Sequence, residues 1–200
     1  KYEHIHKMAN KIEAKSIAKK VGLPILPGSS DNVLDYLEAK SIAESIGYPV
    51  IIKSTNGGGG RGIKVVLKEK ELKNNFLLAK KEAELSFGSN QVYIEKYLNN
   101  PRHIEIQVLC DNQGNAIHLG ERECSIQRRN QKIIEECPSP AISENERKRI
   151  CETTIKAMKK IGYVNIGTVE YLYSDGNFFF MEMNTRLQVE HTVTEEVYDI

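Results

Sequence analysis

The chain has almost no net charge and no long hydrophobic run. Its 200 residues include 28 basic and 27 acidic side chains, for a formal net charge of +1. So small a charge gives no whole-chain electrostatic reason to expect binding to nucleic acid or to a membrane. No segment approaches the roughly 18 apolar residues of a membrane-spanning helix, and the N-terminus shows no signal-peptide pattern. We therefore expect a soluble protein whose partners are recognised by local sites.

Cysteines are few, and none lies in a metal-binding pattern. Cys110, Cys124, Cys137 and Cys151 form no Cys-x-x-Cys pair and have no histidine at zinc-ligand spacing. We expect reduced thiols in a cytoplasmic protein. The 40% hydrophobic content is enough for one or two domains with real cores. Because the chain opens at Lys1 without a methionine, we expect it to be a piece of a longer protein.

The segment from residue 182 to 190 gathers polar side chains of the kinds that bind ions. Glu182, Asn184, Arg186, Gln188 and Glu190 occupy every second position, which predicts one extended strand with all five on one face. Carboxylate and amide oxygens bind hard cations, and arginine can hold an anion through two parallel hydrogen bonds. Such a row would serve a metal-assisted reaction between anions. The alternative is the solvated side of an ordinary edge strand.

A second carboxylate is predicted to face this row. Glu170 lies in a strand expected at residues 167–173, where a charge is costly unless it is paired or bound to metal. A turn at residues 174–177 leads into the next strand, so Glu170 and Glu182 should face each other across an antiparallel ladder. Because two such carboxylates repel unless a cation separates them, the pair predicts a divalent metal site.

Five of the six residues from Gly57 to Gly62 are glycine. A strand carrying Lys53 precedes the run and a second strand is expected after it, whereas a Rossmann glycine loop opens a helix. No Gly-Lys-Ser/Thr follows, which excludes a Walker A motif, and no kinase motif occurs. Glycines let backbone N–H groups approach phosphate oxygens closely. We interpret the run as a lid hairpin over a nucleotide, with a plain surface hairpin as the alternative.

Residues 121–132 are dense in arginines and amides. We favour a buried phosphate or carboxylate partner for this cluster. Nucleic-acid binding is the alternative, but aromatic residues are not interleaved and acids flank the cluster. Elsewhere, periodicity predicts helices at residues 5–21, 32–46, 69–87 and 143–161, and strands at 49–54, 63–67, 91–98, 103–109 and 116–120. The last of these helices should start with a capping box formed by Ser143 and Glu146.

Five segments together resemble the biotin carboxylase component of biotin-dependent acyl-CoA carboxylases. The resemblance runs from about Met8 to the last residue. It implies an α+β ATP-grasp fold: a leading helix and linker at residues 1–24, a glycine-loop lid at 25–97, and an incomplete antiparallel-sheet core at 98–200. The segments are the glycine hairpin after Lys53, Glu-Lys-Tyr-Leu from residue 95, Asn-Pro-Arg-His-Ile-Glu-Ile-Gln-Val from 100, Glu-Arg-Glu-Cys-Ser-Ile-Gln-Arg-Arg-Asn-Gln-Lys from 121, and Glu-Met-Asn-Thr-Arg-Leu-Gln-Val-Glu-His from 182.

The resemblance implies an enzyme, a biotin carboxylase. Such a ligase uses ATP, Mg²⁺ (or Mn²⁺) and bicarbonate to form carboxyphosphate, and then carboxylates biotin on a carrier protein. This is the first half-reaction of acetyl-CoA or propionyl-CoA carboxylase, the former belonging to fatty acid biosynthesis. The implied partners are a biotin carboxyl carrier protein and a carboxyltransferase, with a homodimeric full-length protein in the cytoplasm and no role for nucleic acid or membrane.

The resemblance also implies residue roles. The catalytic set is Glu190 as general base with Lys132 and Arg186, and the bicarbonate set is Lys132, Arg186, Gln188 and Val189. Glu170, Glu182 and Asn184 match the metal site. The nucleotide set comprises Lys11, Lys53, Gly58, Gly59, Gly60, Arg61 and Gly62 at the phosphates, Glu95, Lys96 and Leu98 at the adenine, His103 at the ribose, and Gln127, Asn130 and Leu172.

The sequence departs from the family pattern at several points. Some bacterial acetyl-CoA-type members carry His where Asn130 stands, whereas propionyl-CoA and related members carry Asn, so the subtype stays open. Thr192 stands where family members commonly have Pro. The family's N-terminal domain and its C-terminal part, with an arginine for the biotin enolate, find no counterpart here. We therefore expect these residues to fold as the ATP-grasp region without carboxylating biotin alone. The alternatives are another ATP-grasp ligase, such as one of the carbamoyl-phosphate family, and a nucleotide-binding module without chemistry.

Overall fold

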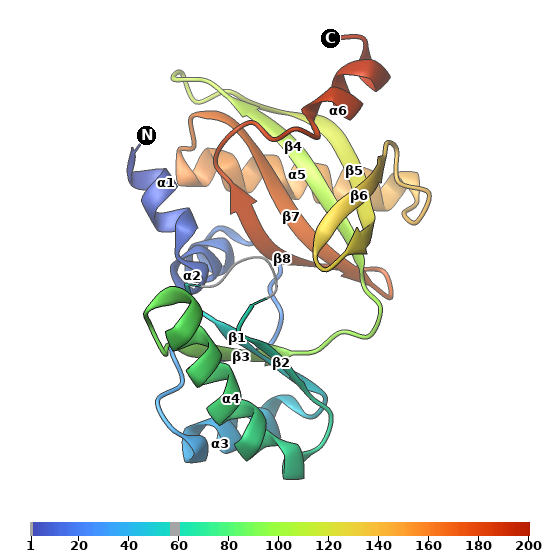
Figure 1. Ribbon diagram of the computed structural model, residues 1–200. Coiled ribbons are helices and arrows are strands. Elements are labelled where there is room, and N and C mark those ends of the chain that lie inside the picture. Colours follow the sequence, from blue (N-terminus) through green and yellow to red (C-terminus); the bar gives the residue numbers. More distant parts are fainter. Residues whose placement is uncertain (1, 57–60) are drawn as a thin grey trace. The chain divides into compact units, whose positions relative to one another are not determined.

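A computed structural model describes residues 2–56 and 61–200, which form two compact units (Figure 1). Unit 1 contains the residues up to Ala9, Glu13–Ile25 and Asn100–Ile200, and unit 2 contains Asn10–Ile12 and Leu26–Asn99. Each unit has its own hydrophobic core. The protein is α+β, as predicted, with antiparallel sheets and separate helices.

Unit 2 is a three-stranded antiparallel sheet with two helices on one face. Val50 and Ile52 of the central strand point toward the helices, and Leu72 and Phe76 of the longer helix meet them in one buried cluster. Since side chains alternate along a strand, Lys53 is directed to the opposite face. The sheet order is β2-β1-β3, built from β1 (Val50–Ser54), β2 (Ile63–Val66), β3 (Val92–Lys96), α3 (Tyr36–Ile46) and α4 (Glu69–Phe87).

Two helix predictions need correction at their ends. The single helix expected at residues 5–21 is two helices, α1 (Tyr2–Ala9) and α2 (Lys11–Val21). They are separated at Asn10, whose side-chain oxygen accepts a hydrogen bond from the Ile12 amide at 3.0 Å and so favours a fresh helix start. The helix expected from residue 32 begins at Tyr36, because Asp35 caps it by accepting from the amide of Glu38.

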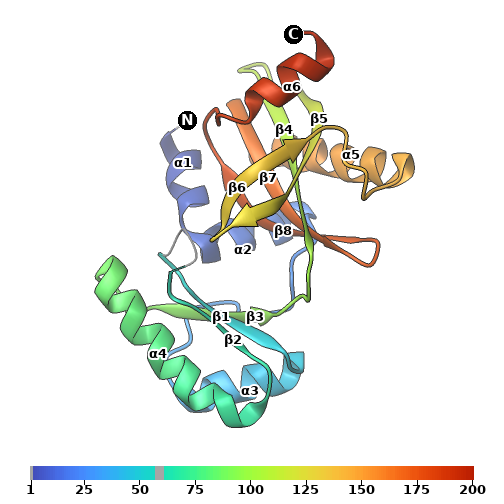
Figure 2. The ribbon, with the colours of Figure 1, turned by 45° about the vertical axis from the view of Figure 1, so that its right-hand side comes forward.

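Unit 1 is organised by a five-stranded antiparallel sheet. Its longest helix, α5, starts with the predicted capping box of Ser143 and Glu146 and covers one face of the sheet (Figures 1 and 2). We call that face the helix face. The sheet order is β6-β5-β4-β7-β8, and the elements are β4 (Arg102–Cys110), β5 (Ala116–Arg128), β6 (Gln131–Glu136), α5 (Glu144–Ile161), β7 (Asn165–Ser174), β8 (Asn177–Asn184) and α6 (His191–Tyr198).

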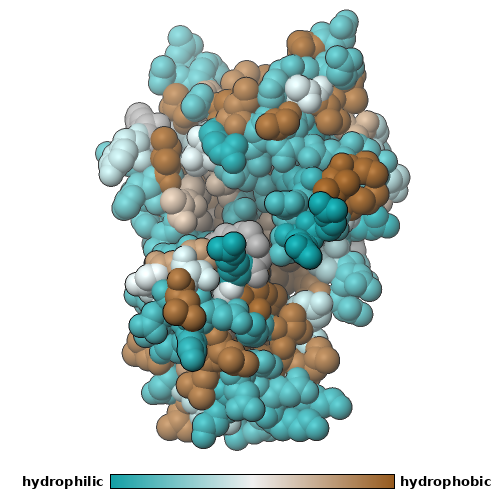
Figure 3. Space-filling view, viewed as in Figure 1, coloured by the Kyte–Doolittle hydropathy of each residue, from teal (hydrophilic) through white to brown (hydrophobic). Residues whose placement is uncertain are grey.

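The charged segment 121–132 forms the rest of β5 and the start of β6, a hairpin that the sequence analysis did not predict. Its two-residue turn, Arg129–Asn130, has positive φ values of 53° and 62°, as a tight hairpin turn requires. Ile133 and Ile134 of β6 are 55% and 54% exposed, and Figure 3 shows apolar surface over this strand. Lys132, next to them, is mostly buried, with 13% side-chain exposure.

A bulge in β8 decides which side chains reach which face of the large sheet. Tyr171 of β7 pairs with Phe180 of β8, yet Glu170 pairs with Glu182, so Met181 is an extra residue. Phe180 consequently packs in the core on the helix face, whereas Glu182 and Asn184 lie opposite Glu170 and Thr168 on the other face. Regular alternation would have placed Phe180 and Glu182 on the same face of the sheet. Bulges are typical places where a side chain is redirected.

The strand predicted from residue 182 to 190 was wrong beyond Asn184. β8 ends there, and a loop leads into α6, which was not predicted. The five polar residues therefore do not share one strand face. Two further findings concern the described residues as a whole: no helix among them is long and apolar enough to cross a membrane, and all four cysteines are free thiols.

Candidate functional site

One row of paired residues crosses four strands of the large sheet, on the face opposite α5. Arg122 of β5 pairs with Glu105 of β4, Glu105 pairs with Glu170 of β7, and Glu170 pairs with Glu182 of β8. We call these four residues the charged row. Arg122, Glu105 and Glu170 are buried, with at most 3% exposure. Buried charges at such density require pairing, which the neighbouring strands supply.

Lys132 of β6 reaches into the charged row and contacts three carboxylates. Its ammonium group forms a short contact with Glu105, lies 3.1 Å from Glu170 Oε1, and lies 3.2 Å from Oε1 of Glu190. Glu190 is the residue immediately before α6. The structure thus brings together Lys132, Glu170 and Glu190, which the sequence analysis had selected from distant segments.

The electrostatics keep these groups charged at neutral pH. Burial by itself would lower the pKa of Lys132, but the carboxylates of Glu170 and Glu105 outweigh burial and raise it. For Glu170, burial opposes ionisation, yet the hydrogen bond and charge of His103 and the charge of Lys132 lower the pKa to about 2. Burial likewise opposes ionisation of Glu190, whose pKa is nevertheless lowered by a backbone hydrogen bond and by Lys132.

His103 borders the charged row. Its Nε2 lies 3.1 Å from Glu170 Oε2, and its Nδ1 lies 2.8 Å from the side-chain nitrogen of Gln127. The Ser125 hydroxyl accepts a hydrogen bond from the His103 amide, which fixes the start of β4. His103 and Gln127, both predicted to bind the nucleotide, are therefore in mutual contact.

The metal prediction can be tested against the oxygen atoms that the fold supplies. Glu170 and Glu182 face each other, and the Asn184 side chain donates to Glu170 Oε1 at 2.8 Å. The side-chain oxygen of Gln188 is buried and has no hydrogen-bond partner among the described residues, although its nitrogen lies 3.5 Å from Glu170. Two carboxylates beside amide oxygens are a set that a divalent cation prefers, so these residues fit such an ion.

A different trio, His103, Glu105 and Glu170, also places its potential ligand atoms within 4.8 Å of one another. Lys132 contacts both Glu105 and Glu170 there, so a cationic group already compensates this side of the row. The predicted metal set of Glu170, Glu182 and Asn184 stays a prediction.

Some predicted residues lie apart from the charged row. Arg186 is exposed, and its guanidinium donates to the backbone oxygen of Leu187 at 3.1 Å. Val189 is 85% exposed. Leu172 lies on the charged face of β7, directly opposite His103 of β4, while Asn130 is at the exposed tip of the β5–β6 hairpin. Arg186 and Val189 follow the end of β8 at Asn184 and therefore lie in a loop. Their predicted contact with an anion stays a prediction.

Two predicted nucleotide residues of unit 2, Lys53 and Glu95, lie on the sheet face away from its helices, whereas Lys96 is paired with Val50 and lies on the helix side. The Lys53 ammonium lies 3.0 Å from Glu95 Oε2, and both side chains are largely buried. Lys96 donates to the backbone oxygens of Gly47 and Tyr48, so its side chain anchors the loop before β1. Lys11 begins α2, Leu98 follows β3, and Arg61 and Gly62 precede β2, whereas Gly58, Gly59 and Gly60 lie outside the described residues.

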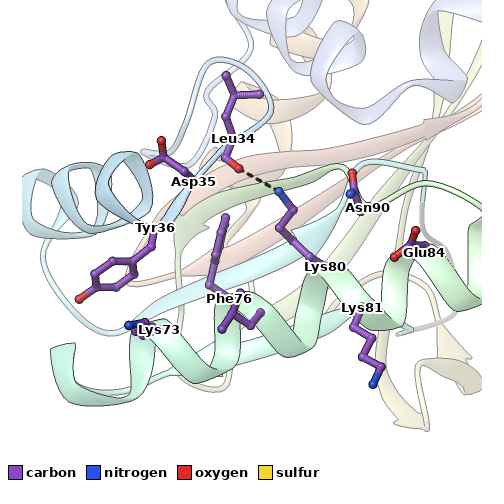
Figure 4. A pocket seen from close by; sticks show the side chains of 10 residues that line it. Leu34, Asp35, Tyr36, Lys73, Phe76, Lys80, Lys81, Glu84 and Asn90 are labelled. Atoms are coloured by element: carbon purple, nitrogen blue, oxygen red, sulfur yellow. Dashed lines mark hydrogen bonds between the residues drawn. The ribbon is translucent and has the colours of Figure 1, made fainter.

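A groove in unit 2 is a separate feature. It runs along α4 beside the residues that precede and begin α3, and Lys80 crosses it to donate to the Leu34 backbone oxygen at 2.8 Å (Figure 4). None of the described residues predicted for nucleotide, metal or bicarbonate lines this groove. We do not assign it to the site.

Three contributors to the charged row were missed from the sequence. Glu105 and Gln107 alternate with isoleucine and valine in β4, a pattern that resembles a solvated strand face. Arg122 was noted only as one of several cations, and its complete burial argues against an exposed nucleic-acid surface. The sequence did hold one signal for them: two neighbouring strands, the later β4 and β5, each carry charged residues, which could pair with one another.

Comparison with known proteins places the chain in a family. Residues 10–200 match the model of the carbamoyl-phosphate synthase L chain, ATP binding domain. The chain belongs to this ATP-binding domain family.

Curated relatives of this ATP-binding domain carry two kinds of name. The chain is 52% identical over 196 residues to biotin carboxylase of Allochromatium vinosum, covering 98% of this chain and 44% of the relative. It is 50% identical over 198 residues to pyruvate carboxylase of Staphylococcus aureus, covering 99% of this chain and 17% of that protein. The chain thus spans less than half the length of these relatives.

Solved structures agree with the fold. A biotin carboxylase from Campylobacter jejuni, in complex with a β,γ-ATP compound, superposes with a TM-score of 0.93 at 50% identity, over 98% of this chain and 44% of that one. The biotin carboxylase domain of a 2-oxoglutarate carboxylase from Hydrogenobacter thermophilus, in complex with MgADP, ADP and bicarbonate, gives 0.93 at 48% identity and the same coverage. The ATP-binding domain therefore has the predicted ATP-grasp fold.

Proposed function

We propose that this chain is the ATP-binding part of a biotin carboxylase. The full-length protein would use ATP and bicarbonate to form carboxyphosphate, and would then carboxylate biotin on a carrier protein. The observation that carries the proposal is the convergence of Lys132 on Glu170 and Glu190 beside the charged row. The Lys132 ammonium thereby lies between Glu170, which is proposed to bind the metal ion, and Glu190, which is not.

The chemistry requires two anions to meet, and the charged face suits that requirement. Bicarbonate and the terminal phosphate of ATP repel each other until cations neutralise them. Lys132 supplies a fixed ammonium group, and the exposed Arg186 can turn its forked guanidinium toward the same anion. A Mg²⁺ (or Mn²⁺) ion held by Glu170, Glu182 and Asn184 would neutralise phosphate oxygens.

Glu190 is proposed as the general base. Bicarbonate is a poor nucleophile until it loses a proton, and an ionised carboxylate nearby can accept that proton. Because the pKa of Glu190 is lowered, this carboxyl group is in its basic form at neutral pH. Gln188, with its unsatisfied side-chain oxygen, and the Val189 backbone complete the proposed bicarbonate set.

Nucleotide-binding residues are proposed within each unit separately. Lys11, Lys53, Arg61 and the glycine run are assigned to the phosphates, and Glu95, Lys96 and Leu98 to adenine. His103 is assigned to the ribose, and Gln127, Asn130 and Leu172 are assigned to the nucleotide without a specified part of it. The mutual contacts of His103 with Gln127 and of Lys53 with Glu95 support this grouping within each unit.

The parent complex is proposed to contain a biotin carboxyl carrier protein and a carboxyltransferase, with a homodimeric full-length protein in the cytoplasm. An acetyl-CoA or propionyl-CoA acceptor is the finer proposal from the sequence motifs. Relatives named for pyruvate and 2-oxoglutarate carboxylation widen the set of acceptors to test.

The decisive experiment measures ADP release by the full-length protein, omitting bicarbonate and free biotin in turn. We expect ADP release that depends on both, and a fall of about a hundredfold or more for Glu190→Gln, since it removes the base. Glu196→Gln, at an exposed position of α6, the helix that follows Glu190, is the matched control. ADP release that ignores bicarbonate would overturn the proposal.

A second candidate is an ATP-grasp ligase that makes carbamoyl phosphate, because the matching family is named for that synthase. ADP release that requires ammonia as well as bicarbonate, and is unchanged by biotin, would favour it. Nucleotide binding without any ADP release would favour a binding module.

A further inference from the structure

Arg122 is a completely buried arginine whose guanidinium is shared between three partners. Its Nε and Nη2 both lie 2.6 Å from Glu105 Oε1, and its Nη1 donates to Gln107 and to the Thr194 hydroxyl, each at 2.9 Å. Glu105 and Gln107 belong to β4, but Thr194 belongs to α6. Arg122 therefore joins the sheet to the helix that begins just after Glu190.

We propose that Arg122 is a positioning residue that keeps Lys132 and Glu190 available for the anionic substrate. The inference rests on the proposed function, because it concerns the same bicarbonate pocket. The hydrogen bonds and ion pair of Arg122 are with Glu105, Gln107 and Thr194, so besides its charge, which helps to lower the pKa of Glu190, it acts through Glu105 and through α6.

The first route is a matter of charge. Glu105 is fully buried and contacts both Arg122 and Lys132. A buried carboxylate needs a compensating cation, and Arg122 provides one at two short contacts. Without Arg122, Glu105 would depend on Lys132 alone, and the ammonium would be drawn away from Glu170, Glu190 and an incoming anion. Arg122 thus keeps the Lys132 ammonium available to Glu170, Glu190 and the incoming anion.

The second route is mechanical. Thr194 stands four residues after Glu190, so both lie on the same side of the helix start. The hydrogen bond from Arg122 to Thr194 fixes the first turn of α6 against the sheet, and the 3.2 Å contact of Glu190 with Lys132 depends on that placement. Losing the Thr194 hydroxyl should loosen Glu190 without changing any charge.

Arg147 provides a matched control on the other face of the same sheet. Its Nε donates to the buried Glu121 at 2.7 Å, and it joins α5 to β5 much as Arg122 joins α6 to β5. Glu121 and Arg122 are neighbours in β5, so their side chains point to opposite faces. A loss of general stability would appear in both arginine variants, whereas a positioning effect would appear only at Arg122.

The test uses the full-length protein and bicarbonate-dependent ADP release. For Arg122→Lys we expect the KM for bicarbonate to rise by about tenfold or more with the affinity for ATP within about twofold of wild type. Arg147→Lys should lower the melting temperature and leave both constants within about twofold. A folded Arg122→Lys protein with a wild-type KM for bicarbonate would overturn the inference, as would an equal loss for ATP and bicarbonate.

A second pair of variants decides the matter if Arg122→Lys does not fold. Thr194→Val keeps the size of the side chain and removes the hydroxyl, and Thr194→Ser restores it. We expect Val to raise the KM for bicarbonate by about threefold or more and Ser to stay within about twofold of wild type. Equal values for Val and Ser would overturn the inference. If wild-type protein shows no bicarbonate-dependent ADP release, the proposed function itself fails and the inference falls with it.

Discussion

The two faces of the large sheet are built from the same strands and have opposite character. On the helix face, Ile104, Ile106 and Tyr171 are fully buried against α5 in an apolar core. On the other face, the residues between them, including Glu105 and Glu170, are equally buried but charged. The comparison shows that alternation of apolar and polar residues marks the two faces of a strand without telling whether the polar face is solvated.

The two faces also make different contributions to the free energy of folding. Burying aliphatic and aromatic surface is favourable in itself, at about 25 cal/mol per Å². Burying an ion pair gains little against apolar residues of equal size, although removing one partner is costly. Burial on the helix face therefore stabilises the fold, whereas the charged face holds charges in fixed positions at some cost in stability.

The largest effect is expected from changing the number of residues at the bulge that keeps the faces distinct. Inserting an alanine after Met181 would shift the rest of β8 by one residue, so Glu182 and Asn184 would point into the core or β8 would lose its pairing. We expect loss of Mn²⁺ binding, measured by electron paramagnetic resonance, together with a cost of several kcal/mol. Met181→Ala keeps the residue count and should retain Mn²⁺ binding. An insertion variant that binds Mn²⁺ as tightly as wild type would show that the register of β8 does not direct Glu182.

A large effect is also expected from unbalancing the charged face. Lys132→Met would leave Glu105, Glu170 and Glu190 without their shared cation, at a cost of about 3–5 kcal/mol in the free energy of unfolding. Urea denaturation measures the loss. Lys148→Met, at an exposed position of α5, is the control. A free energy equal to wild type would mean that the carboxylates are compensated in another way.

A similar or smaller loss of stability is expected on the helix face, with no change in affinity. Ile106→Ala removes buried methyl groups next to Glu105 and Gln107, and should cost about 2–5 kcal/mol. Since its side chain faces α5, the Kd for ATP should stay within about twofold of wild type in isothermal titration calorimetry. A changed Kd would contradict the separation of the two faces.

The smallest effect concerns the cap of the helix that covers the helix face. Hydrogen bonds from Ser143 and Tyr173 lower the pKa of Glu146 to about 2, against an ordinary value of 4.5. The native state thus favours the ionised carboxylate, so its stabilisation is present above pH 4.5 and disappears as the pH falls from 4.5 to 2. We expect Glu146→Gln to lower the melting temperature at pH 7 and to converge on wild type at pH 2. Glu152→Gln, at an exposed position of the same helix, should follow wild type throughout.

Local patterns predicted most elements of the fold. α4 and α5 were placed within a residue of their ends because each has an apolar stripe and a clear start or stop. The facing of Glu170 and Glu182 was also predicted and is confirmed by the strand pairing. The β5–β6 hairpin and α6 were missed, since charged strands and a short helix after a loop lack a clear hydrophobic period.

The sequence by itself determined the ATP-grasp family, the elements and the principal acidic residues, because these depend on short-range patterns and on motifs. Only the tertiary structure decided that Arg122, Glu105, Glu170 and Glu182 form one row, and that the bulge at Met181 turns Glu182 toward it. Register between strands depends on which distant segments pair, and a shift of one residue exchanges the two faces of a strand. For that reason the partners of the buried charges could be read only from the folded chain.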